Sequence, residues 1–134
     1  MCLVSLGFRE HTLISTHMEF VLIVTGAATA SMLAQFIAPL QVLRLTYGEA
    51  PADAVSVALA RHWGLLLFCI GVLLIYAAFH PVVRGPIVIL AAVEKVGFVA
   101  CVLGTSLRKR PVVAVLAAGD ALMVVIYGLY LAGL

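Results

Sequence analysis

Long hydrophobic runs separated by short polar stretches dominate the pattern of this chain. A membrane-spanning helix needs about 20 consecutive, mainly apolar residues. Runs of that length predict helices at about residues 19–43, 55–79, 86–107 and 111–133.

Proline marks the ends of these runs. Pro81 follows the second run, and Pro86 and Pro111 stand at the starts of the third and fourth, where a helix needs no N–H donor. The connections "HPVVRG" (80–85) and "RKR" (108–110) are short. Neighbouring helices are therefore expected to form antiparallel hairpins.

Longer polar segments flank the first run. The stretch "RLTYGEAPADA" (44–54) contains glycine and proline and is typical of a turn into the second helix. Residues 1–18 are expected to be an N-terminal tail, and Met18 is an alternative start to Met1. The pattern predicts an all-α polytopic membrane protein, with one antiparallel four-transmembrane-helix bundle as the single domain of residues 1–134.

Composition supports the membrane assignment. The chain has 134 residues, of which 65% are hydrophobic and 10% charged, and its mean hydropathy is +1.23. A soluble domain is nearer half apolar and a quarter charged. A chain this short cannot bury so much apolar surface, so that surface is expected to face lipid. The net charge of +2 favours neither nucleic acid nor an acidic partner.

Lysine and arginine near helix ends predict the orientation, because these residues collect on the cytoplasmic side. The side of loops one and three holds Arg44, Arg61, Arg108, Lys109 and Arg110, and the other side holds Arg9 and Arg84. Loops one and three are therefore expected in the cytoplasm, with both termini on the non-cytoplasmic side.

Charged residues also occur at membrane depth. Glu94 and Lys95 lie near the middle of the third run, and Asp120 lies near the middle of the fourth. Nearer to the face of loops one and three lie Gln35, Arg61 and His62. A charge in the membrane costs about 2.5–3.5 kcal/mol on insertion scales. These side chains are therefore expected to face the interior of the bundle.

Glu94 and Lys95 are not expected to pair with each other, because adjacent helical residues point about 100° apart. The preferred pairing joins Glu94 to Arg61 and Lys95 to Asp120, and the exchanged pairing is the alternative. Small residues, which allow close helix contact, are expected to share the inward faces. They are Gly26, Ala30 and Ala34 in the first run, Gly64 and Gly71 in the second, and Gly97, Cys101 and Gly104 in the third.

Two hypotheses explain the charged cluster. It is either a salt-bridge network that only fixes helix register, or a site that binds a ligand or handles protons. The predicted pocket consists of Gln35, Arg61, His62, Glu94, Lys95, Asp120 and Tyr127. Glu94 and Asp120 are the candidate acid–base groups, while Arg61 and His62 would hold an anionic or carbonyl oxygen. No metal-ligand spacing or phosphate loop is present, so the sequence assigns no metal and no cofactor.

The layout resembles the small four-helix bacterial membrane proteins of the DoxX-like group. The resemblance rests on "YGEAP" (47–51), "ARHWGLLLFCIGVLL" (60–74) and "HPVVRGP" (80–86). It implies a four-helix bundle in a bacterial inner membrane. In some members of the group, such a bundle is an accessory subunit of a quinone-linked oxidoreductase. The resemblance assigns no catalytic residue. Partner membrane subunits or a homo-oligomer are expected.

The function expected from these observations is binding of a small lipophilic or amphiphilic molecule, or of quinone, or docking onto a larger complex. An isomerase-type membrane enzyme acting on a lipophilic substrate is one alternative. A small proton-coupled transporter is the other, because the size is similar to that of the small multidrug resistance transporters. Those carry an essential acidic residue in their first helix, where this chain has Gln35.

Overall fold

The computed structural model describes residues 13–134, so most of the predicted N-terminal tail lies outside the described residues. In the described part, all regular structure is helical. The elements are α1 (Leu13–Ala30), α2 (Leu33–Ile37), α3 (Pro39–Tyr47), α4 (Ala54–Phe79), α5 (Pro81–Leu103), the 3-10 helix η1 (Ser106–Lys109) and α6 (Pro111–Leu131).

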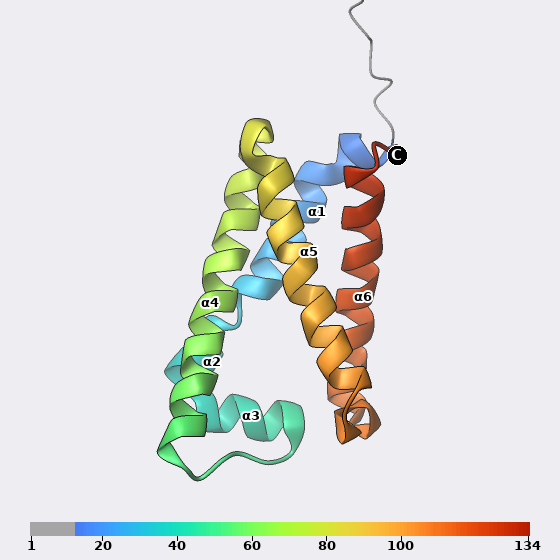
Figure 1. The fold of residues 1–134 in the computed structure, drawn as a ribbon. Coiled ribbons are helices and arrows are strands. Elements are labelled where there is room, and N and C mark those ends of the chain that lie inside the picture. The colour runs from blue at the N-terminus through green and yellow to red at the C-terminus, as the bar shows by residue number, and fades with distance from the viewer. Residues whose placement is uncertain (1–12) are drawn as a thin grey trace, which may run out of the picture.

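Four helical segments are long and apolar enough to cross a membrane: His17–Ile37, Ala54–Phe79, Pro81–Leu103 and Pro111–Leu131. The all-helical class and the four spanning segments are thus confirmed. Large hydrophobic side chains lie exposed along every one of them, as expected of surfaces that face lipid. In Figure 1, α1 runs downward, α4 upward, α5 downward and α6 upward.

The first predicted helix, 19–43, is not continuous. The chain leaves the helical path at Ser31 and again at Ala38, whose φ of −129° and ψ of 65° are not helical. Proline causes the second break, because Pro39 cannot donate to the carbonyl of Gln35 and disfavours a helical conformation in the residue before it. As a result, α3 lies crosswise at one end of the long helices (Figure 1).

The predicted connection at 80–85 is wrong, because α5 already begins at Pro81 and Pro86 lies inside it. As the sixth residue of α5, Pro86 cannot donate to the carbonyl of Val82, so the helix lacks one of its internal hydrogen bonds there. Arg84 strengthens the tight junction: its side chain donates to the carbonyls of Ala77 and Ala78 at 3.0 and 2.7 Å, at the end of α4.

The helices α1 and α4 approach each other most closely through glycine. A Cβ atom on Gly71 would lie 2.6 Å from the carbonyl oxygen of Gly26, and one on Gly64 would lie 2.8 Å from the backbone nitrogen of Phe36 in α2. The predicted inward glycines of the first two runs are therefore confirmed.

The predicted inward stripe of α5 is wrong. Gly97, Cys101 and Gly104 are exposed, and a Cβ atom on Gly97 would meet no atom within 4 Å. The buried residues of this helix are Val88, Ala91, Lys95 and Val102. Their spacing of three, four and seven defines the packed face. Lys95, and not Glu94, therefore belongs to that face.

The buried apolar residues form two clusters. The larger joins α1, α4, α5 and α6 through Met18, Leu22, Leu74, Ala77, Ala78, Val88, Ala91 and Tyr127. The smaller joins α5 and α6 through Val102, Val113 and Ala117, with Tyr47 of α3 packed against it. Asp120 and Lys95 lie along their helices between the two clusters, where apolar packing is interrupted.

Candidate functional site

A partly open cavity of about 210 Å³ lies among the helices at this interruption. An engineered cavity of about 150 Å³ admits benzene, so a small organic molecule fits in this space. All four spanning segments and α3 contribute to the wall. The lining residues are Ala28, Thr29, Met32, Gln35, Thr46, Tyr47, Trp63, Leu67, Glu94, Lys95, Phe98, Val115, Leu116, Gly119, Asp120 and Met123.

An ion pair between α5 and α6 stands in the cavity wall. The ammonium Nζ of Lys95 donates to Oδ1 of Asp120 at 2.8 Å, and the two side chains are 4% and 19% exposed. The predicted pairing of these residues is confirmed. It forms because Lys95 lies on the packed face of α5, from which its long side chain reaches Asp120 of α6.

The predicted partner of Glu94 is wrong. Arg61 is exposed and does not line the cavity. The described cation nearest to Glu94 is the ammonium of Lys95, 3.9 Å from Oε2, too far for a hydrogen bond. That oxygen is buried and has no hydrogen-bond partner among the described residues. One lysine thus forms ion pairs with two carboxylates, so the prediction that Glu94 and Lys95 do not pair with each other is wrong.

Arg61 is exposed near a close contact between α4 and α2. One turn further along α4, Gly64 lies against the backbone of Met32 and Phe36. A contact this close leaves no room on that face for a long side chain. His62 is exposed as well and takes no part in the cavity wall.

Gln35 is buried and lines the cavity. Its Nε2 donates to the backbone carbonyl of Ala60 in α4 at 2.8 Å. This bond holds the short helix α2 against α4, so that the broken segment still forms one side of the cavity.

Tyr127 is fully buried but does not line the cavity. Its hydroxyl donates to Oγ1 of Thr25 at 2.7 Å, inside the larger apolar cluster. The hydroxyl therefore lies in the interior of the bundle. Its predicted place in the pocket is wrong, because Tyr127 lies about two helical turns beyond Asp120 along α6.

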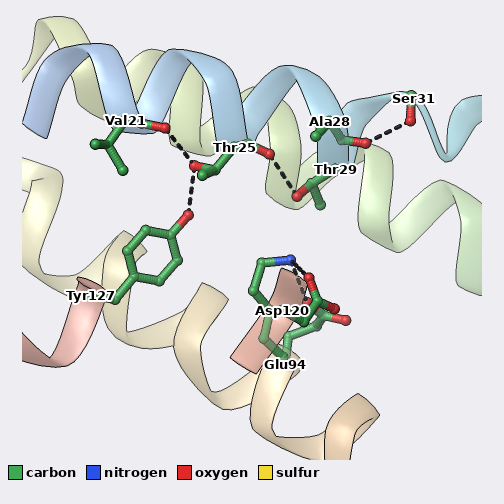
Figure 2. Close-up of polar contacts among 9 residues, drawn as sticks. Val21, Thr25, Ala28, Thr29, Ser31, Glu94, Asp120 and Tyr127 are labelled. Carbon is green, nitrogen blue, oxygen red and sulfur yellow. Dashed lines mark hydrogen bonds and ion pairs between the residues drawn. The ribbon is translucent and has the colours of Figure 1, made fainter. Parts of the chain in front are cut away.

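Two threonines of α1 also take part in the polar contacts, although the sequence did not predict them as site residues. Thr25 Oγ1 donates to the carbonyl of Val21, and Thr29 Oγ1 donates to the carbonyl of Thr25, both at 2.8 Å. Figure 2 shows this chain of bonds running from Tyr127 along α1, and Thr29 lines the cavity. The four-residue spacing of the two threonines was the one feature of the sequence that indicated a shared helix face. It was weak because threonine often bonds to its own helix.

The helix α3 closes one end of the cavity. Tyr47 packs against the smaller apolar cluster, and this burial raises the pKa of its phenol. In the following loop, Glu49 accepts a hydrogen bond of 2.5 Å from Arg110 at the start of α6. Both contacts join α3 and its loop to the α5–α6 hairpin.

The rest of the wall is mainly apolar, with the aromatic side chains of Tyr47, Trp63 and Phe98 and the thioethers of Met32 and Met123. Sequence analysis did not place these residues in the pocket. A few polar groups in an apolar, aromatic wall are typical of a site for a small organic molecule. Among the described residues, no group of His, Cys, Asp and Glu side chains is arranged to hold a metal ion.

In comparisons with known proteins, no family model, no curated protein and no solved structure matches this chain. The resemblance to the DoxX-like group therefore stays a prediction.

Proposed function

We propose that this chain is a membrane-embedded binding protein that takes up a small amphiphilic molecule between its helices. The observation that carries the proposal is the cavity itself, which combines an apolar and aromatic wall with the Lys95–Asp120 pair and the buried carboxylate of Glu94. Such a site holds the apolar part of a ligand by contact and orients its polar part by charge.

The alternative of a network that only fixes helix register accounts poorly for these features. One ion pair with its hydrogen bond formed is enough to fix the register of two helices, and Lys95 and Asp120 form such a pair. Glu94 adds a second carboxylate beside the same lysine, and its buried Oε2 accepts no hydrogen bond from any described residue. A buried acceptor without a hydrogen bond is destabilising. A role in binding gives a reason for keeping such a group beside an open space.

In this proposal the four segments cross a bacterial inner membrane as an antiparallel bundle, with the α3 end in the cytoplasm. Arg44, Lys109 and Arg110 belong to that end and are exposed, as expected for the cytoplasmic side. Arg84 belongs to the opposite end and is engaged with carbonyl groups of α4.

Native mass spectrometry of the protein, extracted gently from its own membranes, tests this function. Gly119 lines the cavity, and a Cβ atom there would meet no atom of a described residue within 4 Å. The change Gly119→Leu should therefore fill the cavity without disturbing the backbone. The matched control is Gly128→Leu, since Gly128 lies on the same helix, has equal space and is outside the cavity wall.

We expect the unchanged protein and Gly128→Leu to retain the same small molecule, and Gly119→Leu to lose it. Equal retention by both variants would contradict binding in the cavity. So would an unchanged protein that emerges without any bound small molecule.

A further inference from the structure

We infer that the molecule held in this cavity carries a primary ammonium group, which pairs with the carboxylate of Glu94. The inference rests on the proposed binding function and specifies the class of ligand.

The charge of the cavity wall favours a cationic ligand. Its charged side chains are Glu94, Lys95 and Asp120, so with all three ionised the cavity carries one excess negative charge. Arg61, which would have neutralised the site, is exposed elsewhere on α4. In a site of low dielectric, this excess favours a cationic ligand over an anionic one.

The missing hydrogen-bond donor also favours such a ligand. Lys95 donates to Asp120 and stays 3.9 Å from Oε2 of Glu94. Gln35 donates to the carbonyl of Ala60, and the hydroxyl of Thr29 donates to the carbonyl of Thr25. No described residue donates to Oε2 of Glu94. A primary ammonium group would supply both the donor and the compensating charge.

The rest of the cavity wall suits a cation that carries a small hydrocarbon body. Trp63 and Tyr47 border the same space, and aromatic faces attract cations. Phe98, Met32 and Met123 offer apolar contact for a hydrocarbon body. The cavity volume of about 210 Å³ favours a compact arylalkylamine over a long-chain molecule.

The fluorescence of Trp63 provides the assay, because it is the single tryptophan of the chain and lines the cavity. The protein is placed in phosphatidylcholine nanodiscs at pH 7 and titrated with three matched probes. These are 2-phenylethylamine (cationic), 2-phenylethanol (neutral) and 3-phenylpropanoate (anionic). The Gly119→Leu variant, whose cavity is filled, measures the quenching that comes only from partitioning of the probes into the lipid.

We expect saturable quenching by the amine at a concentration roughly tenfold lower than by the alcohol, and weakest binding of the carboxylate. Glu94→Gln should remove the advantage of the amine over the alcohol. Glu94→Asp should keep it, and so should Glu19→Gln, which changes an exposed carboxylate outside the cavity wall. If Glu94→Gln does not fold, Glu94→Asp provides the test of the role of the carboxylate.

The outcomes separate the two proposals. If the alcohol or the carboxylate binds as tightly as the amine, or Glu94→Gln keeps the preference, the ammonium inference is wrong and cavity binding stands. If no probe gives saturable quenching that Gly119→Leu abolishes, the binding function itself is overturned.

A second set of nanodiscs containing phosphatidylethanolamine identifies the source of the ammonium group. Competition by this lipid would assign the group to a lipid headgroup. Unchanged amine binding would assign it to a free amine. Both results agree with a primary ammonium at Glu94.

Discussion

Nζ of Lys95 donates a hydrogen bond to Oδ1 of Asp120 at 2.8 Å and thereby joins α5 to α6 near the middle of both spanning segments. The same ammonium lies 3.9 Å from the second carboxylate, that of Glu94. Lys95 is therefore the residue on which the charge balance of the cavity depends.

A double-mutant cycle tests this pair. Lys95→Met should destabilise the protein by about 3–5 kcal/mol, because it leaves two carboxylates without their cation. Asp120→Asn should cost less, since an amide oxygen can still accept from Lys95. The double change should cost less than the sum of the single changes, by about 0.5–3 kcal/mol. The free energy of unfolding in mixed micelles is the measurement.

Lys109→Met is the control for this cycle. Lys109 is exposed at the end of η1, so its replacement should change the free energy by no more than about 0.5 kcal/mol. Strict additivity of the Lys95 and Asp120 changes would show that the pair is not energetically coupled.

The contact between α1 and α4 predicts an asymmetric effect of adding a methyl group to glycine. Gly71→Ala would place its Cβ atom 2.6 Å from the carbonyl oxygen of Gly26, so we expect a loss of about 1–3 kcal/mol as the helices separate. Gly97→Ala meets open space and should be neutral or stabilising by up to about 1 kcal/mol through helix propensity. Thermal unfolding of both variants gives the comparison, and equal behaviour would refute close packing at Gly71.

Tyr127 is expected to act on stability and not on ligand binding. Tyr127→Phe removes the hydrogen bond to Thr25 and should cost about 0.5–1.5 kcal/mol. Quenching of Trp63 by 2-phenylethylamine should stay unchanged, because Tyr127 lies outside the cavity wall. Tyr130→Phe is the matched control, since Tyr130 packs beside the same apolar cluster. A weakened affinity in Tyr127→Phe alone would place this residue in the site.

Asp53 is expected to make stability depend on pH. It caps α4 by accepting a hydrogen bond of 2.8 Å from the N–H of Ser56, and this bond lowers the pKa of its carboxyl. The folded state therefore binds the proton less readily than the unfolded state. The stabilisation is present above the unfolded pKa of about 4 and is lost as pH falls from there through the folded pKa.

Asp53→Asn isolates this contribution, because an asparagine side chain caps the helix without titrating. The free energies of unfolding of the two proteins should diverge in their pH dependence only below about pH 4. Parallel pH profiles throughout the acid range would exclude Asp53 as a contributor.

The sequence by itself determined the class of this protein and the depth of its charges. Hydropathy sums over neighbouring residues, so the spanning segments and the mid-span positions of Glu94, Lys95 and Asp120 are visible without a structure. The preferences of single residues predicted less of the structure. The pattern predicts that the second helix stops before Pro81 and the third starts only at Pro86, whereas Pro81 begins α5, since proline is equally suited to follow a helix or to start one.

Only the tertiary structure decided which side of each helix faces the interior. Neighbouring residues differ in direction by about 100°, so the choice depends on the contacts that the other helices make. The packed face of α5 includes Lys95 and leaves Oε2 of Glu94 without a donor among the described residues. Arg61, one turn from the close backbone contact at Gly64, is exposed and does not line the cavity. These contacts join residues far apart in the chain, and for that reason the cavity and its excess negative charge emerged only from the fold.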